Sequence, residues 1–270
     1  MDLTFNKSWL SSLQRKIKNP LVLFLDFDGT LAPIAPHPDQ SFLDSSTKRL
    51  VQSISKKIPV VLISGRAQAD LKKRVRLSGV TYVGNHGFEI SGQNFQFRMK
   101  NETLWRKFLK NIRIQLEKRL DNLPGVWVEN KKVTLSVHYR LARRETREKA
   151  NQILQQQVKN FNDQGKIRLS GGKAVWEIRP PIEWNKGKAV LWVLKQPGFK
   201  RKWPLYIGDD QTDQDAMRLI RNKGIGIMVG PPSGKGAAHY TLNNPREVHR
   251  FLGWVLKNTS FKNPKKIQKR

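Results

Sequence analysis

The chain has 270 residues, of which 38% are hydrophobic, and its 51 Lys and Arg against 21 Asp and Glu give a formal net charge of +30 at pH 7. This length fits one large domain or two modest ones, and the apolar fraction is enough for a buried core, which excludes a wholly disordered chain. The absence of cysteine excludes disulfides, iron–sulfur clusters, thiolate zinc sites and a cysteine nucleophile, and five scattered histidines form no close pair for a zinc site.

The first third of the chain alternates buried strands with helices. An apolar run over 21–25, ended by Asp26, predicts a strand buried on both faces. It is followed by patterns for a helix near 45–56, a strand at 60–63, a helix near 68–77 and a strand at 81–84. Short connections between alternating strands and helices favour a parallel sheet with right-handed crossovers. We therefore expect an α/β protein with a Rossmann-like parallel-sheet core.

The middle of the chain has a different pattern. Apolar and polar side chains alternate over 133–138, as in a strand with one solvated face, and amphipathic helices are predicted near 104–120 and 150–161. The doubly buried pattern then returns, with strands at 204–207 and 225–229. The predicted parts are a core over 1–87 and 182–270, an inserted α+β cap over 88–181, and a basic tail at 262–270.

The charge and a pI near 10.7 suggest an anionic partner. The basic residues are spread along the chain, however, and no zinc finger, RNP aromatic pair or KH-type glycine loop is present. Diffuse positive charge also attracts small phosphorylated molecules, so nucleic acid is not the expected partner. The apolar run over 21–25 is too short to cross a membrane and no signal-peptide pattern is present, so we expect a soluble, cytoplasmic protein without a membrane partner.

Polar clusters follow three of the predicted strands, and a fourth begins a predicted helix. The clusters are Asp26-Phe27-Asp28-Gly29-Thr30, Ser64-Gly65-Arg66, Asn185-Lys186-Gly187-Lys188 and Gly208-Asp209-Asp210-Gln211-Thr212-Asp213. Each alone also fits an ordinary turn or a helix cap. Because functional sites of open parallel sheets lie at the carboxyl ends of the strands, the clusters together predict one site at that edge.

The chemistry of this site follows from its carboxylates. Asp26 and Asp28 lie one residue apart at a buried strand end, where carboxylates repel each other and lose solvation. A hard cation such as Mg²⁺ offsets both effects, with side-chain ligands from Asp26 and Asp209 and a backbone carbonyl near Asp28. A carboxylate is also an established nucleophile toward phosphorus, and Ser64 and Lys186 are suited to hold phosphoryl oxygens.

These motifs, in their order along the chain, resemble those of phosphatases of the haloacid dehalogenase (HAD) superfamily. Over about residues 20–255 the chain is similar to the trehalose-6-phosphate phosphatases in particular. The segments that carry the similarity are Leu25-Asp26-Phe27-Asp28-Gly29-Thr30-Leu31-Ala32-Pro33-Ile34, Gly84-Asn85-His86-Gly87-Phe88-Glu89, Val137-His138-Tyr139-Arg140 and Glu177-Ile178-Arg179-Pro180.

The resemblance implies a Mg²⁺-dependent phosphatase that acts on trehalose 6-phosphate through an aspartyl-phosphate. It implies that Asp26 attacks phosphorus and ligates Mg²⁺, and that Asp28 protonates the leaving oxygen, then activates water, and contributes to the metal site. Ser64 and Lys186 would bind the phosphoryl group, with Lys188 as a rival for the lysine role. Asp209 would ligate the metal, supported by Asp210 or Asp213.

The resemblance also places sugar recognition in the cap. The implied substrate-binding residues are Arg66, Glu129, Lys131, Arg140 and Glu177. Carboxylates accept hydrogen bonds from sugar hydroxyls, and Lys and Arg donate them. Lys132 stays open as an alternative to Lys131, and the same strand residues also fit ordinary cross-strand charge pairs. His138 fits a packed sheet histidine.

Two other functions remain open at this point. A HAD phosphatase for another sugar phosphate, such as sucrose 6-phosphate, would share the core motifs and differ in the cap. A polyanion-binding protein on a HAD scaffold would account for the charge of +30. The length leaves no room for a glycosyltransferase domain, so a trehalose-phosphate synthase partner is expected to be a separate chain.

Overall fold

The computed structural model describes residues 7–16, 20–172, 174–231 and 236–258. It forms two compact units, a core of Met1–Phe97 with Trp184–Arg270 and a cap of Arg98–Glu183. The sequence analysis began the cap at residue 88, whereas two short strands at Glu89–Ser91 and Gln96–Arg98 extend the core sheet. The predicted basic tail at 262–270 lies outside the described residues.

The core contains a mainly parallel sheet of eight strands in the order β12-β11-β10-β1-β2-β3-β4-β5. All pairings from β12 through β3 are parallel, and β4 pairs antiparallel with β3. The strands are β1 (Leu21–Asp26), β2 (Val60–Ile63), β3 (Thr81–Gly84), β4 (Glu89–Ser91), β5 (Gln96–Arg98), β10 (Trp203–Gly208), β11 (Ile225–Val229) and β12 (Tyr240–Leu242). This arrangement confirms the predicted α/β core.

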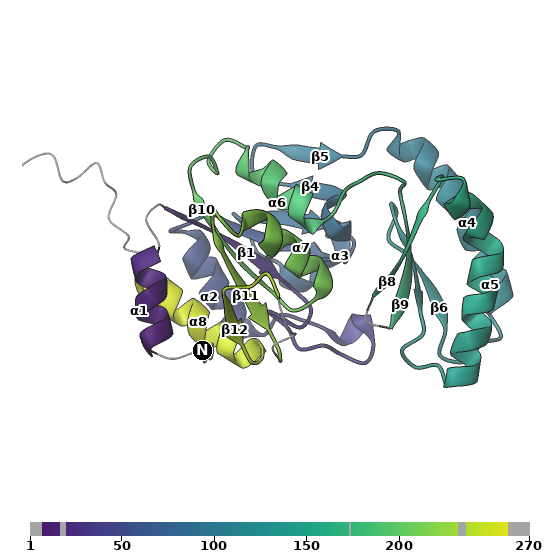
Figure 1. Cartoon of the computed structure of the whole chain (residues 1–270), viewed down its shortest axis with the longest axis horizontal. Coiled ribbons are helices and arrows are strands. Elements are labelled where there is room, and N and C mark those ends of the chain that lie inside the picture. The colour runs from purple at the N-terminus through teal and green to yellow at the C-terminus, as the bar shows by residue number, and fades with distance from the viewer. Residues whose placement is uncertain (1–6, 17–19, 173, 232–235, 259–270) are drawn as a thin grey trace, which may run out of the picture. The chain divides into compact units, whose positions relative to one another are not determined.

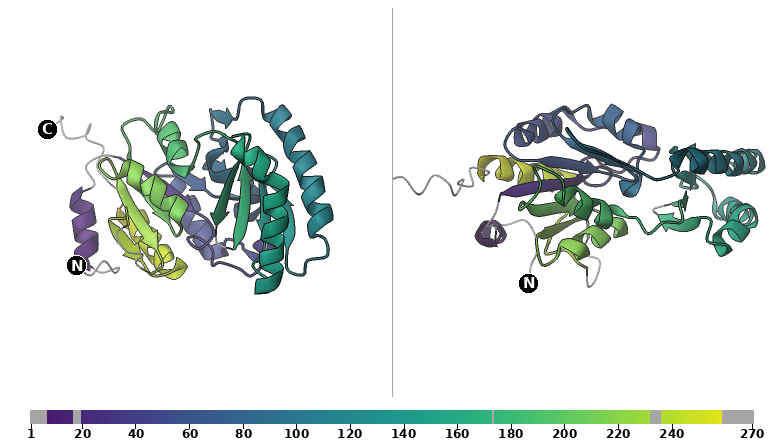
Figure 2. Two further views of the ribbon diagram at one scale, coloured as in Figure 1. Left: turned by 45° about the vertical axis from the view of Figure 1, so that its right-hand side comes forward. Right: turned by 90° about the horizontal axis from the view of Figure 1, so that it is seen from above.

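Helices cover both faces of the core sheet (Figures 1 and 2). They are α1 (Lys7–Lys16), α2 (Ser45–Ser55), α3 (Gln68–Val75), α6 (Lys186–Leu194), α7 (Gln211–Ile220) and α8 (Pro245–Asn258), with 3-10 turns at Pro38–Gln40 and Asn85–Gly87. Leu23 and Leu25 of β1 pack with α2, α3 and α8, whereas Val22 and Phe24 pack with α6 and α7. Burial on both faces explains the continuous apolar run of this strand.

The register of the parallel strands brings distant segments to one edge. Asp26 at the end of β1 pairs with Ile63 at the end of β2, and Leu25 pairs with Ile207 of β10. The residues that follow these strands, Ser64 and Asp209, therefore lie near Asp26 at the carboxyl edge.

The cap consists of an antiparallel sheet of order β6-β7-β9-β8 with two long helices. Its elements are α4 (Glu102–Leu120), β6 (Trp127–Asn130), β7 (Leu135–His138), α5 (Arg144–Asp163), β8 (Arg168–Gly172) and β9 (Val175–Arg179). Leu135 and Val137 pack with both helices in a separate hydrophobic core. Because side chains alternate along a strand, Ser136 and His138 lie on the opposite, polar face of the sheet.

Within the described part of the chain, every helix is too short or too polar to span a membrane.

Candidate active site

Asp26 and Asp209 meet where β1 and β10 end. Asp26 is the last residue of β1 and is 4% exposed, and Asp209 directly follows β10. Gly29 in the intervening loop has φ +81°, and a Cβ atom at this position would lie 2.2 Å from Oδ2 of Asp209. Glycine at position 29 therefore allows both the left-handed turn and the close approach of the Asp209 carboxylate.

Lys186 connects two carboxylates from different elements. Its ammonium nitrogen lies 2.8 Å from Oδ1 of Asp26 and 2.8 Å from Oδ1 of Asp213, and the residue is 1% exposed. Position 186 is the first residue of α6, and the side chain of Asn185 caps this helix by accepting from the Lys188 N–H. The predicted rival Lys188 is half-buried on the same helix, and the contacts to Asp26 and Asp213 belong to Lys186.

Asp213 is fully buried and has both carboxylate oxygens engaged. Oδ1 accepts from Lys186 and from the Tyr206 hydroxyl, the latter at 2.5 Å. Oδ2 accepts from the backbone N–H groups of Asp209 and Asp210, each at 3.0 Å. Gly208 permits this packing, since a Cβ there would lie 2.2 Å from Cγ of Asp213. Asp213 thus fixes the loop that carries Asp209.

Asp210 begins α7 as its N-cap. Its side chain accepts from the Asp213 N–H at 2.9 Å, and the two residues form a capping box. Its carboxylate also lies 3.7 Å from the Lys186 ammonium. Hydrogen bonds and this cation outweigh burial and hold the pKa of Asp210 below its usual value. The predicted supporting residues Asp210 and Asp213 therefore both have structural partners.

Burial and mutual repulsion dominate the charges at this edge. Burial, and after it the carboxylate of Asp213, raises the pKa of Asp26 well above its usual value, against the opposing effect of Lys186. Burial also raises the pKa of Asp213 to about 7. Burial alone would lower the pKa of Lys186, but the surrounding carboxylates, Asp210 foremost, raise it well above its usual value. The site thus holds more acid than one ammonium neutralises.

This excess of negative charge fits a hard metal ion. Carboxylate oxygens of Asp26, Asp209 and Asp213 lie within 4.8 Å of one another. Oxygen donors in a cluster of this kind suit Mg²⁺. Because Asp213 already has both oxygens engaged, Asp26 and Asp209 are the side chains better suited to bind the metal.

Ser64 and Arg66 follow β2. Ser64 is 2% exposed, and its hydroxyl accepts from the backbone N–H of Arg66 at 3.1 Å. Gly65 lies against the His86 ring, where a Cβ would approach within 2.6 Å. The turn at Ser64 therefore depends on a residue without a side chain.

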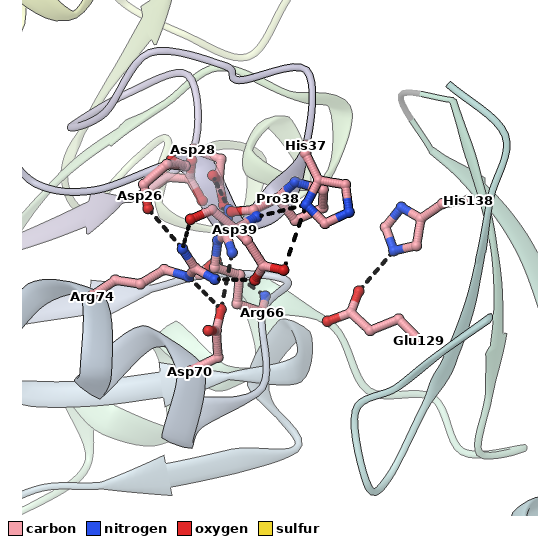
Figure 3. A network of polar contacts seen from close by, with 12 residues as sticks. Asp26, Asp28, His37, Pro38, Asp39, Arg66, Asp70, Arg74, Glu129 and His138 are labelled. Atoms are coloured by element: carbon pink, nitrogen blue, oxygen red, sulfur yellow. Dashed lines mark hydrogen bonds and ion pairs between the residues drawn. The ribbon is translucent and has the colours of Figure 1, made fainter. Parts of the chain in front are cut away.

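Arg66 was predicted to bind substrate, and in the structure its guanidinium binds Asp28 (Figure 3). Nε donates to Oδ2 of Asp28 at 2.6 Å and Nη2 donates to Oδ1 at 2.7 Å. Nη1 donates to Asp70 at 2.9 Å, and Asp70 also accepts from Nε of Arg74 at 2.7 Å. Asp28 is thus held by a network based on α3.

In the cap, the predicted sugar-binding carboxylates share one face of the sheet. Glu129 of β6 and Glu177 of β9 both pair with Ser136 of β7, one on each side. Lys131 lies 3.3 Å from Glu177, and both are buried. Lys132 is exposed with φ +70°, so it is Lys131 that contacts Glu177. Arg140 is exposed in the turn after β7, apart from this row.

Glu129 has a partner of its own. Nε2 of His138 lies 2.7 Å from the Glu129 carboxylate, and the His138 ring stacks on Trp127 with centroids 4.7 Å apart (Figure 3). His138 and Trp127 are register partners on neighbouring strands. The histidine expected to be a packed sheet residue thus also orients a predicted sugar-binding carboxylate.

Tyr206 and Asp70 were not among the predicted site residues. Tyr206 lies in the apolar run of β10, where its hydroxyl was the only signal of a polar role. Asp70 precedes Arg74 by four residues, which is the spacing of an ordinary helix surface pair. Neither pattern distinguishes a site residue from a structural one.

Three comparisons bear on this geometry. A family model described as trehalose-phosphatase matches residues 24–246. The chain is 36% identical over 251 residues to probable trehalose-phosphate phosphatase J of Arabidopsis thaliana, covering 87% of this chain and 67% of that protein. It is 34% identical over 271 residues to probable trehalose-phosphate phosphatase 3 of Oryza sativa subsp. japonica, covering 93% and 73%.

The fold is also similar to solved structures. The C-terminal domain of C. albicans trehalose-6-phosphate phosphatase superposes with a TM-score of 0.79 at 24% identity, covering 95% of this chain and 99% of that one. A trehalose-6-phosphate phosphatase related protein superposes with a TM-score of 0.76 at 21% identity, covering 87% and 97%.

Proposed function

This chain belongs to the trehalose-phosphatase family and hydrolyses trehalose 6-phosphate, and we propose that it does so with Mg²⁺ and through an aspartyl-phosphate on Asp26. It is therefore a phosphoric monoester hydrolase of the HAD type. The observation that carries the mechanism is the buried ammonium of Lys186 between Asp26 and Asp213, beside the Asp209 carboxylate.

Asp26 is the proposed nucleophile. Its carboxylate oxygen attacks phosphorus, and the bond between phosphorus and the sugar oxygen breaks. Lys186 holds Asp26 at 2.8 Å and offsets negative charge as it develops on the phosphoryl oxygens. Ser64, at the end of the neighbouring strand, is suited to donate its hydroxyl to one of those oxygens.

Asp28 is the proposed acid and base. A primary alkoxide is a poor leaving group, so its oxygen takes the proton of the Asp28 carboxyl group as the bond breaks. The resulting carboxylate then removes a proton from the water that attacks the aspartyl-phosphate at phosphorus, releasing phosphate and restoring Asp26. For the first step Asp28 must leave at least one of its two contacts with Arg66.

Asp26 and Asp209 would hold the metal, with a backbone carbonyl at Asp28 as a further ligand. Bound Mg²⁺ would keep Asp26 ionised and neutralise phosphoryl charge. The carboxylates supply the reason for a metal, because burial and repulsion raise the pKa of Asp26 when no second cation is present.

The cap would recognise the sugar through its polar face. Glu129 and Glu177 accept hydrogen bonds from sugar hydroxyls, and Lys131 donates one. His138 and Lys131 hold these carboxylates in place before substrate arrives. Arg140, exposed in its turn, would contribute as a mobile donor. A trehalose-phosphate synthase on a separate chain would supply the substrate.

The test is phosphate release from trehalose 6-phosphate, with sucrose 6-phosphate and glucose 6-phosphate alongside, in Mg²⁺ and in EDTA. We expect Mg²⁺-dependent turnover that prefers trehalose 6-phosphate, and phosphorus label retained on acid-quenched wild-type protein. Asp26→Asn is expected to lose both turnover and label. Turnover by Asp26→Asn, or full activity in EDTA, would contradict the mechanism, and a preference for another sugar phosphate would contradict the cap assignment.

A further inference from the structure

A cavity of about 880 Å³ opens at the amino ends of β2 and β3, the edge of the core sheet opposite to the predicted site. It is lined by the turn after α2, the end of α3, the β4–β5 turn and the segment at 197–199. None of the lining residues belongs to the carboxylate cluster or its network. A volume of this size is in the range of small-molecule sites, about 300–1,000 Å³.

The charged residues that line the cavity are all basic. They are Lys56, Lys57, Lys72 and Arg76, each exposed, and no Asp or Glu is among the lining residues. Nε of Arg76 donates to the Lys73 carbonyl at 3.0 Å, which fixes the side chain and leaves its Nη groups for an outside acceptor. A planar guanidinium beside an ammonium is the arrangement that suits phosphate oxygens.

The inner wall is apolar and rigid. Tyr82 and Phe199 are buried there, and Phe95 is half-buried against Phe199 with ring centroids 5.6 Å apart. The Tyr82 hydroxyl donates to the Leu77 carbonyl at 2.8 Å, so this ring is fixed. Lys72 lies over the Tyr82 ring, with its ammonium 5.6 Å from the centroid. Cations at the rim and aromatic rings on the wall thus face the same space.

Two glycine turns keep the mouth open. Gly79 and Gly198 both have positive φ, +72° and +84°, and no atom lies within 4 Å of a Cβ placed on either. Glycine at these positions is therefore required by backbone conformation and not by close packing. The open space beside them gives a flat molecule access to the wall.

We propose that this cavity binds a nucleoside phosphate, with its phosphates on Lys72 and Arg76 and its base against the wall formed by Phe95. The class follows from the combination of rim cations, aromatic wall and volume. A nucleic-acid strand would need a longer track of cations than one concave site provides. This site is separate from the hydrolysis reaction, and its failure would leave the proposed function untouched.

The test is calorimetric titration of the full-length protein with ADP in EDTA. Arg76→Glu is expected to weaken ADP binding at least tenfold, while the matched charge change Lys110→Glu, on the exposed surface of α4, leaves it within twofold. Both variants should keep wild-type thermal melting and phosphatase activity, which excludes misfolding as the cause.

Three further arms decide between sources of binding. In Asp26→Asn, saturating trehalose 6-phosphate should leave ADP affinity unchanged, and competition would place ADP in the active site and overturn the proposal. Pyrophosphate should bind at least tenfold more weakly than ADP, and equal binding would overturn the role of the aromatic wall. Absence of ADP binding, or binding of a single-stranded oligonucleotide that displaces ADP, would also overturn it.

Discussion

Arg66 holds both carboxylate oxygens of Asp28, with Nε 2.6 Å from Oδ2 and Nη2 2.7 Å from Oδ1 (Figure 3). The Arg66 side chain is 11% exposed and the Asp28 side chain 36%. A carboxylate with both oxygens engaged by N–H donors is well placed but is not ready to give up a proton. Arg66 therefore acts as a positioning residue for Asp28, which must be partly released during the proton transfer.

Replacing Arg66 tests this role. Arg66→Lys keeps the positive charge but loses the two-atom contact, so we expect kcat to fall by about 10–100-fold as Asp28 loses its position. Steady-state kinetics with trehalose 6-phosphate measures the split between kcat and KM. Arg74→Lys, in the same network but without contact to Asp28, is the control. A rise in KM with unchanged kcat would show instead that Arg66 contacts only the substrate.

Lys186 is expected to matter for both stability and turnover. Lys186→Met removes the ammonium between Asp26 and Asp213 and leaves two buried carboxylates without it, a change that costs about 3–5 kcal/mol in comparable buried pairs. Urea unfolding at pH 8 in EDTA measures the free energy of unfolding. Lys188→Met, two residues along α6, is the matched control, with an expected change of less than about 1 kcal/mol. Equal effects of the two variants would contradict the assignment.

Tyr206 is expected to support the site through Asp213. Tyr206→Phe removes the hydroxyl that donates to Asp213 at 2.5 Å while keeping the ring. Because Asp213 also holds Lys186 and the Asp209 loop, we expect kcat to fall by about tenfold and the KM for Mg²⁺ to rise. Tyr240→Phe, on β12, should leave both unchanged. Wild-type kinetics in Tyr206→Phe would limit Tyr206 to packing.

Asp70 is expected to stabilise the fold in a pH-dependent way. Burial opposes ionisation of Asp70, but hydrogen bonds from Arg74 and Arg66 outweigh it and lower its pKa. A lowered folded-state pKa stabilises the protein above the unfolded value, about 3.9, and this stabilisation is lost as the pH falls toward the folded value.

We therefore expect Asp70→Asn to lower the free energy of unfolding by about 1–2 kcal/mol at pH 7 and by progressively less below pH ~4. Urea unfolding at pH 7, 5 and 3.5 measures the difference. Asp163→Asn, which removes an exposed pair with Lys159, is the control and should show no measurable change. A pH-independent cost of Asp70→Asn would mean that the ion pairs are not its source.

His138 is expected to act on sugar recognition alone. His138→Phe keeps the stacking on Trp127 but removes the contact to Glu129. We expect the KM for trehalose 6-phosphate to rise by about 5–20-fold, because Glu129 loses its orientation. Hydrolysis of p-nitrophenyl phosphate, which lacks the sugar, should be unaffected. Loss of both activities would show that the substitution disrupts the cap sheet.

The residue pattern determined the α/β core and the carboxyl edge as the place of the site. Doubly buried strands produce continuous apolar runs, and parallel strands necessarily end at a common edge, so Asp26, Ser64 and Asp209 were placed together before any coordinates. The antiparallel cap followed from alternation over 133–138, since a sheet with one solvated face must alternate.

Only the tertiary structure decided the partners of these residues. Side-chain partners far apart in the chain, such as Arg66 with Asp28 or Tyr206 with Asp213 across β10 and α7, depend on distances that no local pattern encodes. The same holds for β4 and β5, which extend the core sheet, because pairing of short strands is set by the neighbouring edge and not by their own residues. Sequence fixes which groups can do the chemistry, and packing determines which of them are held in place to do it.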